Sequence, residues 1–381
     1  MIYCTNCFYP SSKPDLVFDK NGKCSACIAF ESRKKIDWRR RKNEFSEIVK
    51  LIKKKSYNYD CLIPVSGGKD STWQVLKTLE YGLKPLCVNA RTCDLSLIGR
   101  ENLDNIKSLG VDLIEVVPDQ KIRHKLNKIG LLEVGDISWP EHVAIFTIPI
   151  KMAINFNIKY IFWGENAQNE YGGPLEKIDN KVLDRNWLEE FGGLLGLRLT
   201  DLKEHYDLSA EDLIIYTYPN EDEIKKKNLQ SLFLGYFFEW DGYKNYKIAQ
   251  EHGFKPYHKL VEGTPVSYEN LDNHQTGIHD YFKFLKYGFG RTTDIANNLL
   301  RRKMISRKTA SSLIKKYDGK YPSTYLGKKL DNILKDIDVN KKLFIETCDK
   351  FTNTSIFKIN NQGKPLRQKD KKLIFLDDIV N

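Results

Sequence analysis

Apolar and polar residues alternate along the first half of the chain in a rhythm typical of short strands and amphipathic helices. An apolar run at 61–65 is followed, after a polar turn, by apolar residues at the helical spacing of Val75, Leu76 and Leu79. The run predicts a strand buried on both faces. The spacing predicts a helix that ends near Gly82.

The same alternation continues to about residue 163. Apolar runs predict strands at 85–89, 113–117 and 159–163, and periodic segments predict helices at 101–109, 119–129 (closed by Gly130) and 141–157. Alternating strands and helices predict an α/β fold with a doubly wound parallel sheet, in which ligands bind at the carboxyl ends of the strands. From Asn180 onward the rhythm is lost and aromatic residues become dense, so we expect a mostly helical C-terminal region.

The turn between the first strand and its helix carries the main chemical signal. It has the sequence Ser66-Gly67-Gly68-Lys69-Asp70-Ser71. Two glycines let backbone N–H groups close on an anion at the positive end of the helix dipole, Lys69 adds a cation, and Ser66 and Ser71 add hydroxyl groups. These features predict a phosphate site.

This turn differs from the Walker A loop. That pattern needs a glycine five residues before the Gly-Lys pair and a Ser or Thr after the lysine, where this chain has Ile63 and Asp70. An aspartate beside a phosphate is repulsive unless a cation lies between them, so we expect Asp70 to hold Mg²⁺.

Further polar residues follow two other predicted strands. Asn89 and Arg91 follow the second strand, where they would contact the adenosine half of a nucleotide. Gly164 and Glu165 follow the fourth strand. Glu165 is consistent with a second metal ligand, a substrate contact or an ordinary surface acid.

Four of the eight cysteines lie near the start of the chain, in two Cys-x-x-Cys pairs: Cys4, Cys7, Cys24 and Cys27. Two such pairs predict a tetrahedral zinc site, and four protein ligands make its role structural. Two disulfides are the alternative, which the lack of a secretory signal disfavours. A basic helix is expected at 32–55, after this segment.

The net charge of +11 is concentrated in two stretches. Residues 31–55 and 301–316 each carry a net charge of +7, which is consistent with an anionic partner or with solvated helix faces. Among the late aromatic residues, Arg291 is able to hold a carboxylate or phosphate through two hydrogen bonds. No apolar stretch is long enough to span a membrane and no leader is evident, so we expect a cytoplasmic protein.

Taken together, the chain resembles the N-acetyl sugar amidotransferases of the WbpG/PseA type, which are ATP pyrophosphatases of the PP-loop class. The resemblance rests on the four cysteines, the 66–71 turn and three further motifs: Ile36-Asp37-Trp38, Trp163-Gly164-Glu165-Asn166 and Tyr287-Gly288-Phe289-Gly290-Arg291-Thr292-Thr293-Asp294. It implies an adenine nucleotide alpha hydrolase-like fold, divided into a zinc ribbon at 1–31, a PP-loop domain at 32–190 and a substrate or partner region at 191–381.

The resemblance also implies a reaction. An acetamido oxygen of a sugar would attack the α-phosphate of ATP, and ammonia would then displace AMP to leave an acetamidino group, in bacterial surface-glycan biosynthesis (lipopolysaccharide O-antigen, capsule or nonulosonic acid). The implied cofactors are ATP, Mg²⁺ and structural Zn²⁺. The residues expected to act in catalysis are Ser66, Lys69, Asp70, Glu165 and Arg291.

No glutaminase motif is evident, because no cysteine stands in a recognisable nucleophile pattern. The resemblance therefore implies a separate glutaminase subunit, with or without a cyclase-like companion, and a sugar substrate that is free or nucleotide-linked.

Two other functions fit part of the pattern. A tRNA-thiolating enzyme would also pair a zinc ribbon with this ATP loop, and the positive charge suits RNA. However, no cysteine pair outside the ribbon is spaced for a persulfide relay, so we do not expect a nucleic-acid partner. A zinc-ribbon adaptor with an inactive nucleotide fold is disfavoured because every residue of the phosphate turn is present.

Overall fold

The computed structural model describes residues 1–55, 58–175, 179–183 and 195–376. Its main sheet has five parallel strands in the order β3-β2-β1-β4-β5, and a two-stranded antiparallel sheet joins β6 to β7. The strands are β1 (Cys61–Pro64), β2 (Pro85–Ala90), β3 (Asp112–Val116), β4 (Tyr160–Trp163), β5 (Gln230–Phe233), β6 (Thr324–Tyr325) and β7 (Lys328–Lys329). The predicted doubly wound sheet is confirmed.

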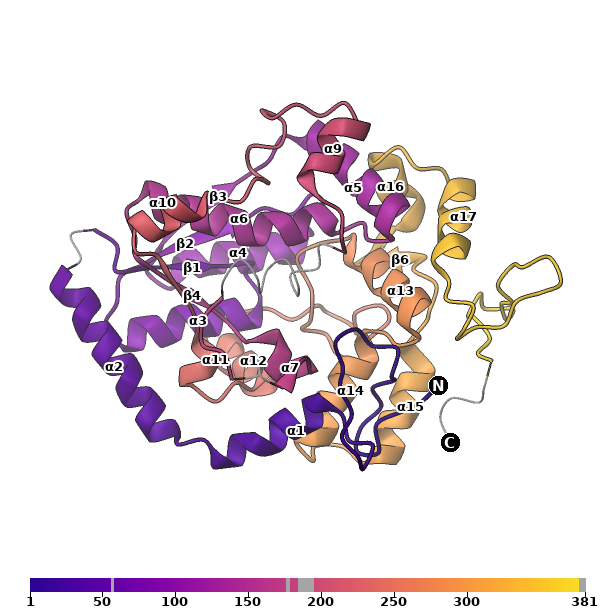
Figure 1. Ribbon diagram of the computed structural model, residues 1–381, viewed down its shortest axis with the longest axis horizontal. Helices are drawn as coiled ribbons and strands as arrows, with labels where there is room; N and C mark the ends of the chain where they lie inside the picture. Colours follow the sequence, from indigo (N-terminus) through magenta and orange to yellow (C-terminus); the bar gives the residue numbers. More distant parts are fainter. Residues whose placement is uncertain (56–57, 176–178, 184–194, 377–381) are drawn as a thin grey trace.

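Helices surround the sheet and form most of the regular secondary structure described in the C-terminal half (Figure 1). Those in the first half are α1 (Ser25–Ser32), the 3₁₀ helix η1 (Arg33–Lys35), α2 (Trp38–Lys55), α3 (Lys69–Glu80), α4 (Leu97–Ser108), α5 (Gln120–Val134), α6 (Trp139–Asn155) and α7 (Ala167–Tyr171). Those in the second half are α9 (Leu199–His205), α10 (Glu221–Lys226), α11 (Leu234–Phe237), α12 (Gly242–Glu251), α13 (Thr276–Tyr287), α14 (Arg291–Arg301), α15 (Arg307–Tyr317), α16 (Leu330–Asp336) and α17 (Lys341–Phe351).

Alternate residues of the strands point to opposite faces of the sheet, and each face has its own core. Leu62 of β1 packs with the apolar residues of α5 and α6, whereas Cys61 and Ile63 pack with those of α2, α3 and α4. Burial on both faces explains why the strands are continuous apolar runs in the sequence.

The order of the strands places a switch point between β1 and β4. Both strands run in the same direction, but β2 lies on the far side of β1 and β5 lies on the far side of β4. The connections that leave β1 and β4 therefore diverge, and a crevice forms at the carboxyl ends of these two strands.

Two helix boundaries differ from the prediction. α4 begins at Leu97, four residues earlier than expected, because Ser96 caps it by accepting a hydrogen bond from the Gly99 N–H at 2.9 Å. α5 continues through Gly130 to a left-handed cap at Gly135. An internal glycine costs a helix only about 1 kcal/mol, and Leu131 beyond it is fully buried in the C-terminal core.

The expectation that the strand pattern stops at Asn180 is wrong. β5 pairs with β4 in parallel, so the sheet extends past the predicted limit of the nucleotide-binding domain. The strand was missed because Gln230–Phe233 is only four residues long and lies among dense aromatic residues. The predicted boundary at residues 190 and 191 lies outside the described residues.

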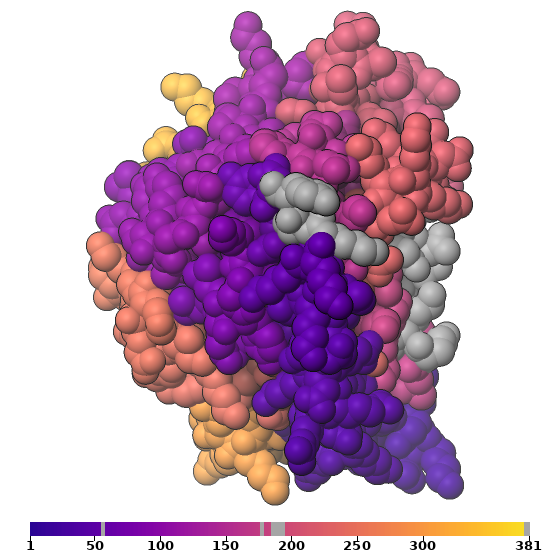
Figure 2. All heavy atoms as spheres, turned by 90° about the vertical axis from the view of Figure 1, so that its left-hand side faces the viewer, coloured from indigo at the N-terminus to yellow at the C-terminus, as the bar shows by residue number. Residues whose placement is uncertain are grey.

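The predicted basic helix at 32–55 is divided. η1 ends before Ile36, and α2 starts again at Trp38, where Asp37 accepts a hydrogen bond from the Arg40 N–H at 2.9 Å. α2 lies along the edge of the molecule, and the N-terminal residues (indigo to dark violet) cover much of the face in Figure 2. Most of its charged residues thus belong to a solvated face, but Arg41 is buried and pairs with Asp179, and the apolar stripe of the helix packs on the sheet.

The C-terminal helices form a separate core that also receives residues from the α/β region. Side chains of α13, α16 and α17 pack around Phe282 and Phe344, and Leu131 and Ile137 reach this cluster from the α5–α6 corner. Within the described residues, no helix has both the length and the apolar character needed to cross a bilayer.

Phe45 offers a test of how α2 is held to the sheet. Its ring is fully buried against Tyr81, Phe162, Phe237 and Phe238, with ring centroids 4.9 to 5.3 Å away. Phe45→Ala should lower the free energy of unfolding by about 3–5 kcal/mol, because it leaves a cavity. Urea denaturation followed by circular dichroism measures this change.

Leu51→Ala on the same helix is the matched control, since Leu51 is about half exposed. It should change the free energy of unfolding by less than about 0.5 kcal/mol. Equal effects of the two substitutions would show that α2 is not anchored through Phe45.

Candidate active site

The predicted phosphate turn lies at the carboxyl end of β1 and leads directly into α3. Gly68 caps the helix, and Gly67 has a φ of +83°. A Cβ atom at Gly67 would lie 2.6 Å from the backbone nitrogen of Leu103 in α4, so a larger residue would displace one of the two segments. The turn thus presents the N-terminus of α3 to a cavity of about 100 Å³.

The two serines of the turn have different surroundings. Ser71 Oγ donates to the Gly68 carbonyl oxygen at 3.0 Å and is buried. Ser66 is exposed, and its Oγ accepts from the Gly68 N–H at 3.3 Å. Of the two hydroxyl groups, that of Ser66 is the one directed to solvent, where a phosphate would approach.

Lys69 is buried between two carboxylates. It forms an ion pair with its neighbour Asp70, and its Nζ lies 3.0 Å from Glu269 Oε1. Burial alone would lower the pKa of Lys69, but these carboxylates hold the pKa well above its ordinary value. Lys69 is therefore a permanent cation at the bottom of the cavity.

Two of the groups that contact this lysine–aspartate pair come from the C-terminal half of the chain. Glu269 is one, and Asn245 of α12 is the other, since its Nδ2 donates to Asp70 Oδ1 at 2.8 Å. The sequence analysis missed both. Asn245 and Glu269 are separated from the loop by more than 170 positions, and no local spacing marks them.

Glu165 follows β4 and lines a separate small cavity with Arg33 and Trp240, close enough to Asp70 and Lys69 to interact with their charges. It is half-buried, and burial together with the charge of nearby Asp70 raises the pKa of Glu165 to about 7. The adjacent Gly164 is held closely: a Cβ atom there would lie 2.9 Å from Gln74 Nε2 of α3. The structure therefore brings Asp70 and Glu165, from the two sides of the switch point, into one electrostatic environment.

Tyr171, the last residue of α7, interacts electrostatically with Glu165, Glu269 and Lys69. The sequence did not predict this residue as part of the site. Burial and the charges of Glu165, Glu269 and Asp294 all raise the pKa of this tyrosine. It stays a neutral hydroxyl group.

Arg291 lies in a neighbouring cavity of about 180 Å³, which it shares with Asp280, Tyr281 and Tyr325. Its guanidinium donates to both oxygens of Asp280, at 2.9 and 3.3 Å. Burial would lower the pKa of Arg291, but Asp280 and Asp294 hold it well above its ordinary value. The predicted anion contact of Arg291 is thus satisfied by a carboxylate of the protein itself.

A short segment joins the two cavities. Glu269 contacts Lys69, and the next residue, Asn270, accepts hydrogen bonds from Arg291 at 3.1 and 3.2 Å when its amide oxygen faces the guanidinium. Residues 268–272 all line the cavity at the phosphate turn. The segment therefore connects the loop to the cavity of Arg291.

Neither Asn89 nor Arg91 is among the described residues that line the cavity of the phosphate turn. Asn89 is buried and its Nδ2 donates to the Val65 carbonyl oxygen at 2.7 Å, so it supports the end of β1. Arg91 is about one-third exposed, 3.8 Å from Glu115. Their contact with adenosine stays a prediction.

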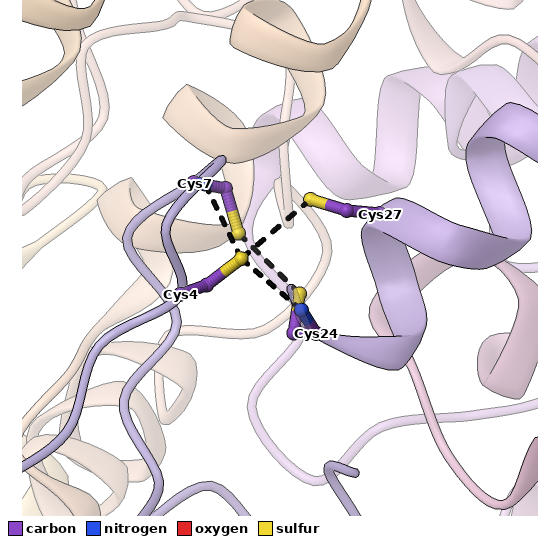
Figure 3. A group of neighbouring side chains, drawn as sticks. All are labelled: Cys4, Cys7, Cys24 and Cys27. Carbon is purple, nitrogen blue, oxygen red and sulfur yellow. Dashed lines mark hydrogen bonds between the residues drawn. The ribbon is translucent and has the colours of Figure 1, made fainter. Parts of the chain in front are cut away.

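The four predicted zinc ligands do come together (Figure 3). Cys4 and Cys7 approach from the N-terminal loop, Cys24 and Cys27 approach from the start of α1, and the four Sγ atoms lie within 4.8 Å of one another. The Cys4 Sγ also accepts N–H bonds from Asn6, Cys7 and Cys24. Four buried sulfurs at this spacing, with backbone donors around them, fit a tetrahedral zinc ion.

The cysteine segment packs against the C-terminal domain beside the site. The Tyr9 hydroxyl donates to Asp294 at 2.9 Å, and the Phe8 N–H donates to Asn297 of α14 at 2.8 Å. Just beyond α1, Arg33 forms an ion pair with Glu170 of α7, which Arg302, the C-cap residue of α14, also approaches at 3.5 Å. The segment thus fixes α7, and with it Tyr171, against α14.

Residues 243–370 match the family model described as "LPS biosynthesis protein WbpG-like, C-terminal domain". This match confirms the resemblance to the WbpG-type proteins. The matched region includes Asn245, Glu269 and Arg291, and it therefore supplies the residues that contact the phosphate turn from the C-terminal half. A search of the curated proteins found no match.

Several solved structures are similar to part of the chain. An NH₃-dependent NAD synthetase from Campylobacter jejuni has 13% identity over 50% of this chain and 95% of that one, with a TM-score of 0.28. An NMN synthetase from Francisella tularensis has 12% identity over 56% of this chain and 96% of that one, with a TM-score of 0.26. Scores this low do not by themselves establish a common fold or activity.

The environment of Glu165 predicts a pH dependence of stability. Its pKa is higher in the folded protein than the ordinary value of 4.5, so the folded state binds its proton more tightly. The stabilising contribution is fully present below pH 4.5 and is lost as the pH rises through about 7. Glu165→Gln, which does not ionise, should remove this loss.

Urea denaturation midpoints between pH 5 and pH 8, without ATP or Mg²⁺, measure the effect. The stability of Glu165→Gln relative to the wild type should increase with pH, whereas the exposed control Glu251→Gln should show a constant difference. A pH-independent difference for Glu165→Gln would contradict the raised pKa.

Proposed function

Because the chain carries a WbpG-like C-terminal domain that contacts its phosphate turn, we propose that it is an ATP-dependent amidotransferase acting on an N-acetyl sugar. The product would be an acetamidino sugar used in bacterial surface-glycan biosynthesis, such as that of lipopolysaccharide O-antigen, capsule or nonulosonic acid. The observation that carries this proposal is the contact of Glu269 and Asn245 with Lys69 and Asp70. Through it, one site contains both the nucleotide turn and the family-specific domain.

The proposed reaction has two steps. The acetamido oxygen attacks the α-phosphorus of ATP, the bond to the bridging oxygen breaks, and pyrophosphate leaves. Ammonia then adds to the O-adenylyl imidate carbon, AMP departs with the former amide oxygen, and loss of a proton leaves the amidine. Adenylation is needed because the oxygen of an amide is otherwise a very poor leaving group.

The turn would stabilise the departing pyrophosphate. The N–H groups of the first turn of α3 point at the cavity, and Lys69 supplies a fixed positive charge there. Lys69 already faces two carboxylates, so an incoming phosphate would take the place of Glu269 or share the lysine with it. Ser66 would add a hydroxyl donor at the solvent side.

Carboxylates near the turn would hold the magnesium ion. Asp70 and Glu165 offer carboxylate oxygens from both sides of the switch point, and Glu269 lies beside Lys69. When bound, Mg²⁺ would neutralise phosphate charge. Loss of the Glu165 proton at neutral pH would make this carboxylate available as a ligand.

The cavity of Arg291 is the proposed sugar subsite. It combines aromatic rings (Tyr281 and Tyr325) with the carboxylates of Asp280 and Glu262, a mixture that suits the apolar faces and hydroxyl groups of a sugar. Asn270 lines the cavity of the phosphate turn and contacts Arg291, so the proposed subsite lies beside the proposed nucleotide site. Arg291 would bind a phosphate or carboxylate of the substrate by exchanging its contact with Asp280.

The reaction is tested by incubating candidate acetamido sugars with the protein, ATP, Mg²⁺ and an ammonium salt. Mass spectrometry should detect a sugar in which NH has replaced one oxygen, together with AMP. Lys69→Ala should lower the rate of AMP formation by about 10²–10³, because it removes a charge that acts on the leaving group.

Lys77→Ala, on the outer part of the same helix, is the control and should retain the wild-type rate, since Lys77 pairs with Glu80 and lies against the rings of Trp73 and Phe238. Formation of ADP and orthophosphate, or an undiminished rate in Lys69→Ala, would refute the role of the turn.

The source of ammonia gives a second prediction. We propose that a separate glutaminase subunit supplies it, with or without a cyclase-like companion, because the chain shows no glutaminase nucleophile motif. The isolated protein should form the amidine with ammonium but not with glutamine, and the comparison of the two nitrogen sources at equal concentration measures this. Efficient use of glutamine by the chain alone would overturn the prediction.

A further inference from the structure

A second group of potential metal ligands lies away from both cavities, at the corner between α5 and α6. Its members are Asp136, His142 and His279. His279 Nδ1 lies 2.8 Å from Asp136 Oδ1, and His142 Nδ1 lies 3.1 Å from Asp136 Oδ2. Neither cavity described above is lined by these residues.

The local backbone holds the carboxylate in place. Gly135 takes the left-handed conformation that ends α5, and Asp136 follows it with its backbone N–H bonded to the Gly130 carbonyl oxygen at 2.9 Å. Asp136 Oδ1 also accepts from the Ser138 N–H at 2.9 Å. The carboxylate therefore has one orientation, and its side chain is only 3% exposed.

The two imidazoles come from different domains. His142 lies in the first turn of α6, in the nucleotide-binding domain, and His279 lies in the first turn of α13, in the WbpG-like domain. Their rings meet edge to face with centroids 5.1 Å apart. Each side chain is about one-quarter exposed, so solvent reaches the edge of the cluster but not the carboxylate.

We propose that Asp136, His142 and His279 bind a divalent transition-metal ion of the zinc class between the two domains. One ligand atom from each residue lies within 4.8 Å of the others. Neighbouring ligands of an ion with bonds of about 2.1 Å are themselves about 3.0–3.4 Å apart, so small shifts suffice to admit the ion. Two imidazoles and one carboxylate favour zinc over magnesium or calcium, which prefer oxygen ligands.

A metal ion at this site would affect the position of α13 and of the Arg291 cavity. His279 directly precedes Asp280, whose carboxylate binds Arg291. An ion bound to His279 and to the α5–α6 corner would fix α13 against the nucleotide-binding domain. It would thereby set the position of the Arg291 cavity, with three protein ligands and open coordination positions filled by water.

Zinc stoichiometry of the full-length protein tests this inference. The protein is saturated with Zn²⁺ alone, passed through a desalting column and analysed by mass spectrometry of the metal. The wild type should retain two zinc ions per chain, one at the cysteines and one at this site. His142→Ala and His279→Ala should each retain one, and the exposed control His252→Ala should retain two.

X-ray absorption at the zinc edge supplies a readout that does not depend on stoichiometry. The wild type should show nitrogen or oxygen scatterers together with sulfur, and His279→Ala should show sulfur alone. A wild type that retains one zinc ion with only sulfur neighbours would overturn the inference, and would leave the three residues as an ion pair between domains. Retention of two zinc ions by both histidine variants would overturn it equally.

Discussion

The parallel pairing of β1 with β4 is the constraint on which the rest of the site depends. Leu62 lies opposite Ile161 in the register of these strands, so their carboxyl ends stop at the same edge of the sheet. The connections then diverge, because β2 and β5 lie on opposite sides of this pair. Asp70 and Glu165 consequently lie close enough for their charges to interact, although they are separated by 95 positions in the chain.

The charge arrangement in this crevice requires both halves of the chain. A buried lysine is costly unless carboxylates compensate it. Asp70 supplies one such carboxylate from the turn itself, and Glu269 supplies another from the C-terminal domain. The charge of Lys69 is therefore balanced by carboxylates from both halves of the chain.

The N-terminal cysteine segment also packs where the two halves of the chain meet, against α7 and α14. Its own apolar core is small, and the four buried cysteines occupy much of it. A metal ion would supply the stability that so short a segment lacks. Once folded, it fixes Tyr9 against Asp294 and joins Arg33 to Glu170, so that α7 and α14 keep their places around Tyr171.

What the sequence determined by itself was local. The strand–turn–helix unit, the alternation that leads to a parallel sheet and the two cysteine pairs are each encoded within short stretches, because helical and strand periodicity and Cys-x-x-Cys spacing are properties of neighbouring residues. Lys69, Asp70 and Glu165 could be selected for the same reason: each follows an apolar strand directly. The four-residue strand β5 has too short a pattern to be recognised in this way.

What only the tertiary structure decided was which distant residues meet. Asn245 and Glu269 have no distinctive spacing, and their contact with the turn follows from the packing of the C-terminal region on the sheet. The same packing brings His279 to Asp136, whereas the pairing of β1 with β2 directs Asn89 toward the backbone of Val65. The physical reason is that periodicity records which side of an element is buried, whereas the partner it is buried against depends on the path of the whole chain.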